Sequence, residues 1–418
     1  MPLELRHRSK ANSNWIHSSR LHVVLYTFLL VATPFVLLQN FLVERIAIVS
    51  SSSIEIGGVV VRIVPTTALI LGIFLLVYFR SHLTRLRILA GVVVLLMIAL
   101  AQQITDFYFG HNFYDLQQNW HYLAYGIFPF MMYRDLIPRR IPLTKIILIT
   151  YFSAMSFSCF DETFQMHMSN RVFDMCDIAK DVWGTLLGMV LILLGGNQAR
   201  ALTARWRQIR HPKLKGYTKH PFSLLILIFV FALLFLCFSS LLTDSVHWKS
   251  VILLTVGTFA LFFILFHASQ YKWGKYGLIL TLTVGLLVQS YFLVKHHSDG
   301  IIHNQYGLTV HKGIPIPFFD LMIYPDGGFR LVDKKHYFNQ RDQTFFLKQR
   351  TDIILIAKGM YGKGGKGFPE ETPVQFIYNK YTQQGTQLII LKNTEACRLF
   401  NRLKREGKSV LFILHNTC

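Results

Sequence analysis

Long apolar runs separated by short polar connections fill most of the chain up to residue 294. A helix needs about 20 consecutive apolar residues to cross a bilayer. The sequence offers nine candidates for such helices: residues 21–41, 64–79, 88–107, 120–133, 143–160, 182–196, 222–242, 251–268 and 276–294. The second, fourth and sixth are short, and a short segment can be tilted or re-entrant. The pattern therefore predicts a mainly α fold, a polytopic transmembrane helix bundle.

A different pattern fills the connection between the first two candidates. Residues 46–64 alternate around Gly57-Gly58, which is typical of a β-hairpin with a tight turn. The hairpin could cover the outer mouth of a site or could simply connect two helices, and we favour the second alternative.

The character of the chain changes from about residue 301, where charged residues and glycines become frequent. The expected elements are a strand at 352–357, a glycine-rich stretch at 358–369, a helix at 374–384 ended by Gly385, a strand at 387–391, a helix at 394–406 and a strand at 409–415. Thr394 is a suitable N-cap for the second helix, and Gly407 suits a left-handed residue that ends it. Strands that alternate with helices predict a small α/β domain.

These patterns divide the chain into three parts. Residues 1–198 hold the N-terminal spans, residues 199–295 hold three further transmembrane helices, and residues 296–418 form the soluble α/β domain.

Charge adds a prediction of orientation. The chain has 43 Lys and Arg residues against 22 Asp and Glu residues, a formal net charge of +21. Before residue 296 the positive residues gather in alternate connections: 1–20, 80–87, 134–145, 200–219 and 272–275. Cytoplasmic connections are enriched in Lys and Arg. We therefore expect a protein of the bacterial inner (plasma) membrane with a cytoplasmic N-terminus and, after an odd number of spans, the C-terminal domain outside.

The positive charge is then a topology signal and an attraction for anionic lipid, and we expect no nucleic-acid partner. Residues 1–20 lack a small-residue cleavage site, so we expect residues 21–41 to be a retained anchor.

The segment between the fifth and sixth spans is rich in ionisable residues, which are costly at membrane depth and usually functional there. It contains Asp161, Glu162, Arg171, Asp174, Asp177, Lys180 and Asp181. At about 100° per residue, one stripe of a helix carries Asp177, Asp181, Gly184 and Gly188. Small residues four apart let a neighbouring helix approach closely. The stripe therefore predicts a packed seam that leads into an acidic site.

This segment resembles the VanZ-like family of membrane proteins. The family pattern D-E-x-x-Q, an Arg, then D-x-x-x-N-x-x-G-x-x-x-G is matched in order by Asp161, Glu162, Gln165, Arg171, Asp177, Gly184 and Gly188. Asp181 stands where the family usually has Asn. Upstream, His121 and Tyr125 match the family's H-F-x-A-Y helix, while Gln117 replaces a frequent Asp. The resemblance covers residues 80–198 and implies a cell-envelope membrane protein; the founding member is associated with glycopeptide (teicoplanin) resistance, and most relatives have no settled activity.

The C-terminal part resembles the Mth938-like domain, which includes adipogenesis-associated and complex I assembly proteins. The resemblance rests on DIILIAKG and on GTQLIILKNTEACRLFNRLKREGKSVLFILHNTC, which ends the chain. It is good from Asp352 onward and faint over residues 307–346. It implies an α/β fold without an agreed activity, in relatives that are usually soluble and intracellular.

We expect a polar network near the outer membrane surface, because side chains that border hydrocarbon must satisfy one another, water or a ligand. Its candidates are Asp161, Glu162, Gln165, Arg171, Asp177, Asp181 and His121, with Gln102 and Asp106 facing it from the third span. Arg171 could pair with a carboxylate to fix this segment or could hold a lipid phosphate, and both interpretations stay open.

Specific chemistry is harder to assign. His167 and its acidic neighbours could ligate a metal, but their spacing fits no fixed motif, so we favour a hydrogen-bonded network and expect no metal and no cofactor. The chain has no G-x-S-x-G motif, and catalytic residues stay unassigned. The glycine-rich stretch carries Lys363 and Lys366 and could bind phosphate, but it is not a P-loop, and we favour a flexible connection. Asn401 could bond to this stretch or face solvent.

The five cysteines leave their pairing open. Cys159–Cys176 and Cys397–Cys418 could form disulfides at an oxidising outer face, or all five could be free. Cys237 lies within a span and is expected to be a free, buried thiol.

Two function classes remain. The first is an accessory or binding protein of the cell envelope, whose outer acidic site engages a lipid-linked or envelope component and whose C-terminal domain recruits a protein partner. The second is a membrane enzyme acting on a phospholipid or lipid-linked head group, with Asp161 or Glu162 as general base. We favour the first because the sequence shows no nucleophile or metal pattern.

Overall fold

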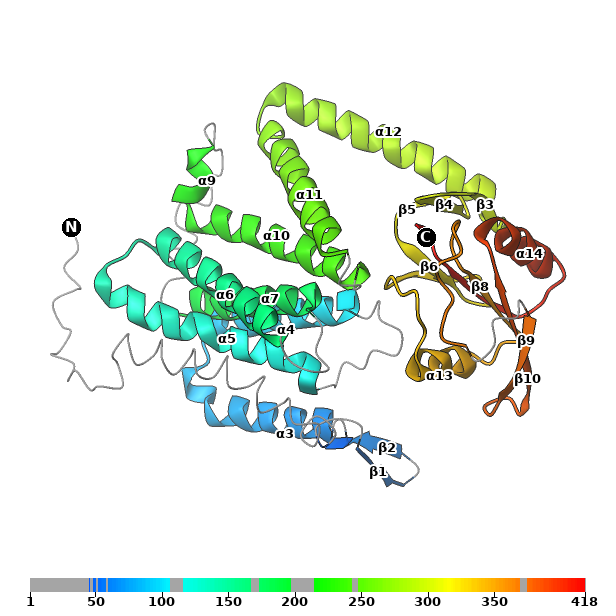
Figure 1. The fold of residues 1–418 in the computed structure, drawn as a ribbon. Coiled ribbons are helices and arrows are strands. Elements are labelled where there is room, and N and C mark those ends of the chain that lie inside the picture. The colour runs from blue at the N-terminus through cyan, green and yellow to red at the C-terminus, as the bar shows by residue number, and fades with distance from the viewer. Residues whose placement is uncertain are drawn as a thin grey trace.

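The computed structural model describes residues 45, 48, 49, 52–57, 59–105, 116–166, 173–196, 214–242, 247–368 and 374–417. The predicted first span, at 21–41, lies outside the described residues. After the hairpin of β1 (Ser53–Ile56) and β2 (Val59–Arg62), which pair antiparallel as predicted, the chain forms a helix bundle and then a mixed α/β domain (Figure 1).

The bundle contains eight long helices among the described residues. They are α3 (Ile63–Tyr78), α4 (Arg85–Thr105), α5 (Leu116–Leu136), α6 (Leu143–Gln165), α7 (Met175–Gly195), α10 (Pro221–Leu241), α11 (Trp248–Ala268) and α12 (Lys272–His296), with the short α9 (Lys215–Lys219) before α10. Within the described residues, six of these helices are long and apolar enough to cross a membrane: α4, α6, α7, α10, α11 and α12. The chain is therefore compatible with a membrane protein. The prediction of nine spans is not confirmed, because α3 is short and α5 is not among the six apolar helices.

The central helix of the bundle is α7, which packs against α4, α5, α6 and α10 (Figure 1). Within its apolar span, 78% of the residues are buried. A helix that is apolar on all sides belongs in the interior of a bundle. Trp183 of α7 is fully buried and donates its Nε1–H to the carbonyl oxygen of Met97 on α4, at 3.3 Å. The neighbours of α7 therefore enclose its acidic start as well as its apolar body.

Two glycines set the distance between α7 and α5. A Cβ on Gly184 would lie 3.0 Å from the carbonyl oxygen of His121, and a Cβ on Gly188 would overlap the carbonyl oxygen of Gly126. Backbones approach this closely only where the residue has no side chain. The contact places His121, near the start of α5, against the acidic end of α7.

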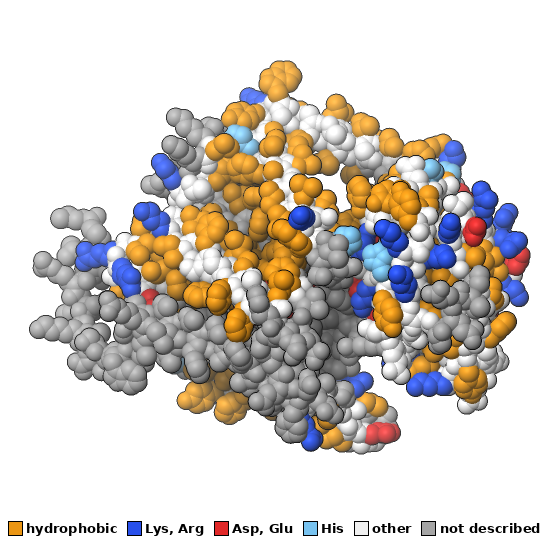
Figure 2. Space-filling model, viewed as in Figure 1, with side chains coloured by type: hydrophobic (Ala, Val, Ile, Leu, Met, Phe, Trp, Pro, Cys, Tyr) orange, Lys and Arg blue, Asp and Glu red, His pale blue; other side chains and the backbone are white. Residues whose placement is uncertain are grey.

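The peripheral helices expose apolar surface. None of the span of α12 is buried, and only 11% of the span of α11 is. Leu253, Leu280 and Leu286 are each more than half exposed, and Figure 2 shows apolar side chains over the part of the view where α11 and α12 lie. Exposed apolar helices of this length suit a lipid environment.

The C-terminal domain contains two sheets. A three-stranded antiparallel sheet has the order β3 (Ile301–Gln305), β4 (Leu308–His311) and β5 (Ile314–Pro317). A six-stranded sheet has the order β7 (Phe329–Val332), β6 (Asp320–Ile323), β11 (Val410–Leu414), β8 (Ile353–Ala357), β10 (Gln384–Leu391) and β9 (Val374–Asn379). The central strand β8 is parallel to both β10 and β11.

Helices cover both faces of the larger sheet. On one face, Leu355 and Phe412 pack against Phe400 of α14 (Asn393–Arg405). On the other, Ile354 and Leu411 share a core with α13 (Gln340–Lys348). Alternate strand residues point to opposite faces, so the nearly continuous apolar strands β8 and β11 are buried on both sides.

Two predictions for this domain are wrong. Residues 374–384 form β9 and the turn into β10, because alternate residues such as Phe376 and Tyr378 are strong strand formers that share one face. Thr394 is not the N-cap of α14; Lys392 occupies that position and makes no side-chain cap bond. Gly407 has the predicted left-handed conformation, with φ +70°. The side chain of Asn401 follows neither expected alternative. Its amide oxygen accepts the backbone N–H of Ile301, and its amide nitrogen donates to the carbonyl oxygen of Ile301.

The domain contacts the bundle at the end of α10. The backbone N–H of Lys334 donates to the carbonyl oxygen of Leu241 at 3.2 Å, and the rings of Phe238 and Phe319 stack with centroids 6.2 Å apart. The Gln289 side chain of α12 donates to the carbonyl oxygen of Gly313 at 3.0 Å. Successive long helices run in alternate directions, so the domain lies at the same end of the bundle as the start of α7.

Candidate functional site

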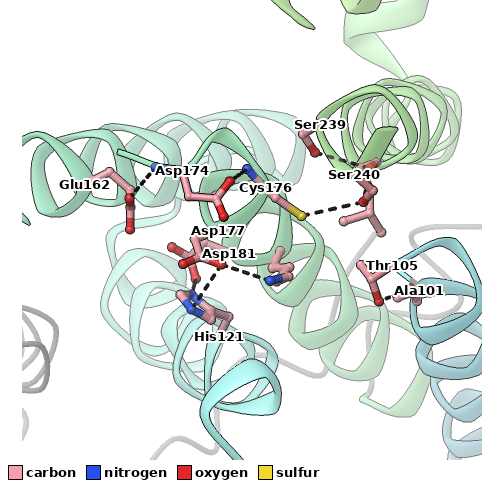
Figure 3. Close-up of polar contacts among 12 residues, drawn as sticks. Ala101, Thr105, His121, Glu162, Asp174, Cys176, Asp177, Asp181, Ser239 and Ser240 are labelled. Carbon is pink, nitrogen blue, oxygen red and sulfur yellow. Dashed lines mark hydrogen bonds and ion pairs between the residues drawn. The ribbon is translucent and has the colours of Figure 1, made fainter. Parts of the chain in front are cut away.

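Four helix ends meet at the acidic cluster: the start of α5, the end of α6, the start of α7 and the end of α10 (Figure 3). The polar side chains from these ends form two linked groups. One is built around His121, and the other is built around Glu162.

The first group is built around His121 and Asp181. His121 Nδ1 lies 2.8 Å from Asp181 Oδ1, and the Ser158 hydroxyl donates to Asp181 Oδ2 at 2.6 Å. Both oxygens of this buried carboxylate, which is 2% exposed, are therefore bonded. Buried polar groups are stable only when paired in this way, so Asp181 holds α5, α6 and α7 together.

Asp177 lies one turn earlier on α7, on the side of His121. His121 Nε2 is 3.6 Å from Asp177 Oδ1, and the same oxygen accepts a hydrogen bond from Lys180 Nζ at 2.9 Å. Lys180 is 2% exposed, and a buried ammonium requires a partner of opposite charge. Asp177 therefore neutralises a cation that the sequence analysis did not include in the site.

The second group ties α6 to α7. Glu162 Oε2 accepts the backbone N–H of Asp174 at 3.0 Å, and Oε1 accepts the Gln165 amide at 3.1 Å. Asp174 in turn caps α7 by accepting the N–H of Cys176 at 2.7 Å. Both oxygens of Glu162 are thus used to close the connection between the helices, which indicates a structural role.

Asp161 has a different environment from its neighbour. Its Oδ2 accepts the Gln165 amide at 3.2 Å. Its Oδ1 is buried, and among the described residues it has no hydrogen-bond partner. A buried carboxylate oxygen without a donor is unfavourable, so Asp161 is the member of the site with capacity for a ligand.

Some predicted members do not join the cluster or cannot be placed. Gln102 bonds to Asn119, with its amide nitrogen 2.7 Å from the Asn119 oxygen. Arg171, Asp106 and His167 lie outside the described residues. Cys159 and Cys176 are free and do not pair with each other, and Cys237 is free but only partly buried.

The structure adds two serines that sequence reasoning missed. Ser158 lies one turn before Asp161 and Glu162 on α6, so helical spacing could have placed it on the same face. The hydroxyl oxygen of Ser240 on α10 lies 3.5 Å from the sulfur of Cys176. Nothing in the sequence could reveal that contact, because the residues are far apart along the chain.

The arrangement does not match a serine hydrolase. Ser158 bonds to the carboxylate of Asp181 and not to His121, whereas an activated serine must bond to the histidine. Within the described part of the chain, no group of three His, Cys, Asp or Glu side chains could hold a metal ion. What the site does offer is an excess of carboxylate groups at the edge of the bundle.

Comparisons with known proteins add little to this geometry. No family model matches the chain, and no curated protein matches it. Two solved structures show a weak likeness. One, named MT938, is 18% identical, with 28% of this chain and 98% of that chain covered and a TM-score of 0.23. The other, a conserved hypothetical protein PH1505 from Pyrococcus horikoshii OT3, is 23% identical with the same coverage and TM-score.

Proposed function

We propose that the chain is an integral membrane binding protein of the cell envelope, related to the VanZ-like proteins, whose acidic site holds an amine-bearing head group of a lipid-linked component. In this proposal the site faces outward, and the C-terminal domain is Mth938-like and recruits a protein partner. This is the accessory role that the sequence favours.

The supporting observation is the excess of negative charge. Asp161, Glu162, Asp174, Asp177 and Asp181 are together in the cluster, and the described cation is Lys180, with His121 as a group that can be protonated. Even if Arg171 joined them, the carboxylates would outnumber the cations. Carboxylates this close need a cation or a proton, and a primary ammonium supplies both a positive charge and three N–H donors.

Asp161 is the expected contact for that ammonium, because its Oδ1 is buried and has no donor among the described residues. Replacing a charged acceptor in such a pair costs about 1.5–3 kcal/mol, or roughly ten- to a hundredfold in affinity. Glu162 and Asp181 are expected to support the site, since their oxygens are already bonded.

Two lipids that differ only in the head-group nitrogen test the proposal. Full-length protein in detergent is titrated with short-chain phosphatidylethanolamine, whose ammonium has N–H donors, and with phosphatidylcholine, whose quaternary nitrogen has none. We expect only the ethanolamine lipid to raise the melting temperature. Asp161→Asn should lose this effect, and Asp352→Asn, at an exposed position, should keep it. Equal effects of the two lipids, or a normal response of Asp161→Asn, would refute the proposal.

The enzyme alternative is tested in the same preparation. Release of head group from either lipid by the wild-type protein, lost in Glu162→Gln, would favour catalysis over binding.

The proposal that the C-terminal domain recruits a protein is supported by its edge strand. Among the described strands, β9 forms one edge of the larger sheet, and its Phe376 and Tyr378 are 76% and 68% exposed. Exposed edges with aromatic side chains can pair with a partner strand. A photo-crosslinking residue at position 376 should capture a defined partner in cells, while one at position 352 should not. Equal capture at both positions would contradict the proposal.

A further inference from the structure

A second buried polar group lies in the C-terminal domain, away from the acidic site. It sits where two parallel strands end: the glycine-rich loop (residues 358–368) follows β8, and His415 follows β11. Open α/β sheets bind ligands beyond the carboxyl ends of their parallel strands. Both the loop and the histidine are therefore at the edge of the sheet where a ligand is expected.

Asp320 of β6 orients His415. Asp320 Oδ2 lies 2.8 Å from His415 Nδ1, and Oδ1 accepts the backbone N–H of Asn416 at 2.9 Å. Burial alone would raise the pKa of Asp320, but His415 and Lys334, whose Nζ is 3.7 Å away, hold that pKa below its usual range. An ionised carboxylate can only accept, so Nδ1 carries a proton, and in the neutral imidazole Nε2 then presents a lone pair.

The other ring nitrogen of His415, Nε2, is buried and makes no hydrogen bond within the described structure. The residue is 1% exposed, and among the described residues Nε2 has no hydrogen-bond partner. Buried polar atoms are almost always bonded. An oriented, buried acceptor without a donor indicates a site that a ligand completes.

The glycine-rich loop lies directly on this imidazole. A Cβ on Gly364 would lie 2.6 Å from His415 Cδ2 and 2.9 Å from Nε2, closer than any side chain tolerates. The loop also has glycines in the left-handed region, where other residues are strained: Gly359, Gly362, Gly365 and Gly367. The sequence therefore allows the loop to cover the histidine closely and to change conformation at little cost.

The loop itself carries positive charge. Lys358, Lys363 and Lys366 belong to it, residues 353–368 contain no Asp or Glu, and Lys363 and Lys366 are exposed. A ligand that suits this site carries negative charge and also has a proton to donate to Nε2. A phosphate monoester meets both conditions, because its second ionisation lies near pH 6 and the monoanion keeps an O–H group.

We propose that the glycine-rich loop and His415 form a binding site for a phosphate monoester, in which the P–OH group donates to His415 Nε2 and the loop lysines hold the remaining oxygens. The loop covers the site in the structure described here and opens to admit the ligand. This site is independent of the acidic cluster and of the function proposed for it.

Acylation of histidines by diethyl pyrocarbonate, followed peptide by peptide with mass spectrometry, tests the proposal on full-length protein in phosphatidylcholine nanodiscs at pH 6.5. His311 is the matched control, since it is fully buried and its Nε2 also has no partner among the described residues. We expect His415 to react faster than His311, because only His415 lies under the loop that is proposed to open. Inorganic phosphate should slow the reaction of His415 about tenfold at about ten times its dissociation constant, and should leave His311 unchanged.

Two further arms identify the ligand. Sulfate at equal ionic strength carries no proton near neutral pH and should protect weakly. Nanodiscs that contain phosphatidic acid present the same monoester on a lipid, so protection there without protection by soluble phosphate would assign the site to a lipid. Gly364→Ala should abolish protection by filling the space over the imidazole, and the double variant K363Q/K366Q, altered only at exposed positions, should weaken it severalfold.

The proposal fails if His415 reacts no faster than His311, since the loop then does not open. It also fails if neither form of phosphate protects, or if sulfate protects as well as phosphate.

Discussion

At the scale of single residues, neighbouring carboxylates in this chain have different tasks. Asp161 and Glu162 are adjacent in sequence, yet Glu162 uses both oxygens to close the connection between α6 and α7. Asp161 keeps one buried oxygen that has no donor in the described part of the chain. The difference follows from the helix, which turns successive side chains by about 100°. Only the geometry distinguishes the structural residue from the candidate ligand contact.

Asp333 in the C-terminal domain provides a residue-scale prediction. It is 1% exposed, and the nearest cation is Lys335, whose Nζ lies 3.5 Å from Oδ2 and also 3.2 Å from Asp342. Burial, with some opposition from Lys335, raises the pKa of Asp333 to about 7. Because this folded pKa exceeds the unfolded value, the folded state binds the proton more tightly, and its contribution to stability is lost as the pH rises from about 4 to about 7.

We therefore expect the melting temperature of the wild-type protein to decline between pH 4 and pH 7, and we expect Asp333→Asn to reduce that decline. The difference between the ordinary pKa of an Asp, about 4, and a pKa of about 7 corresponds to at most about 4 kcal/mol. The exposed Asp352→Asn serves as the control and should follow the wild-type profile. A profile for Asp333→Asn that matches the wild type would mean that the carboxyl group is not protonated in the folded state.

At the scale of elements, the contact between α5 and α7 positions the site. Gly188 and Gly184 remove side-chain bulk from α7, and this lets α5 bring His121 to the carboxylates of Asp177 and Asp181. The helix ends then supply the remaining bonds. Asp174 caps α7 with its side chain, and a cap of this kind stabilises a helix start by about 1 kcal/mol.

The close contact between α5 and α7 predicts that one methyl group added at Gly188 destabilises the protein. Gly188→Ala would push α5 away from α7 and should lower stability by about 1–3 kcal/mol, as overpacked cores do, with a loss of binding at the acidic site. Gly91→Ala on α4 is the matched control, because a Cβ there meets nothing within 4 Å, and alanine is the better helix former. Thermal melting of both variants decides the matter, and equal melting temperatures would show that the seam is not tightly packed.

At the scale of the whole molecule, the alternation of helix directions places the acidic site and the C-terminal domain at one end. The domain contacts the last turn of α10 through the bond from Lys334 to Leu241. The residue before Leu241 is Ser240, which touches Cys176 at the start of α7. The turn between α11 and α12 is separated from this end by the length of α11. If the bundle spans a membrane, the site and the domain must face the same compartment.

Charge distribution predicts that this compartment is outside the cell, with Cys418, which lies beyond the described residues, outside as well. Tyr378→Cys in the domain should react with an impermeant maleimide in intact cells. Trp273→Cys, at a position 90% exposed in the opposite turn, should react only after the membrane is opened. The reverse result would place the C-terminal domain in the cytoplasm. Labelling is assigned peptide by peptide, so the native cysteines do not interfere.

The sequence by itself determined the apolar helices, the hairpin at Gly57, the glycine that ends α14 and the acidic stripe on α7. Each depends on local spacing or on the conformational preference of one residue, and such information is contained in neighbouring positions. The sequence-based prediction is wrong at residues 374–384. A helix was expected there, but residues 374–379 form a strand that pairs with β10.

Only the tertiary structure decided which polar groups meet. The bonds of Ser158 to Asp181, of His121 to Asp181 and of Asp320 to His415 join separate elements. Their formation depends on how helices and strands pack, because a buried charge selects its partner from whatever the fold brings within about 4 Å. The oxygen of Asp161 and the nitrogen of His415 that lack a partner among the described residues are likewise results of packing, and no spacing in the sequence specifies them.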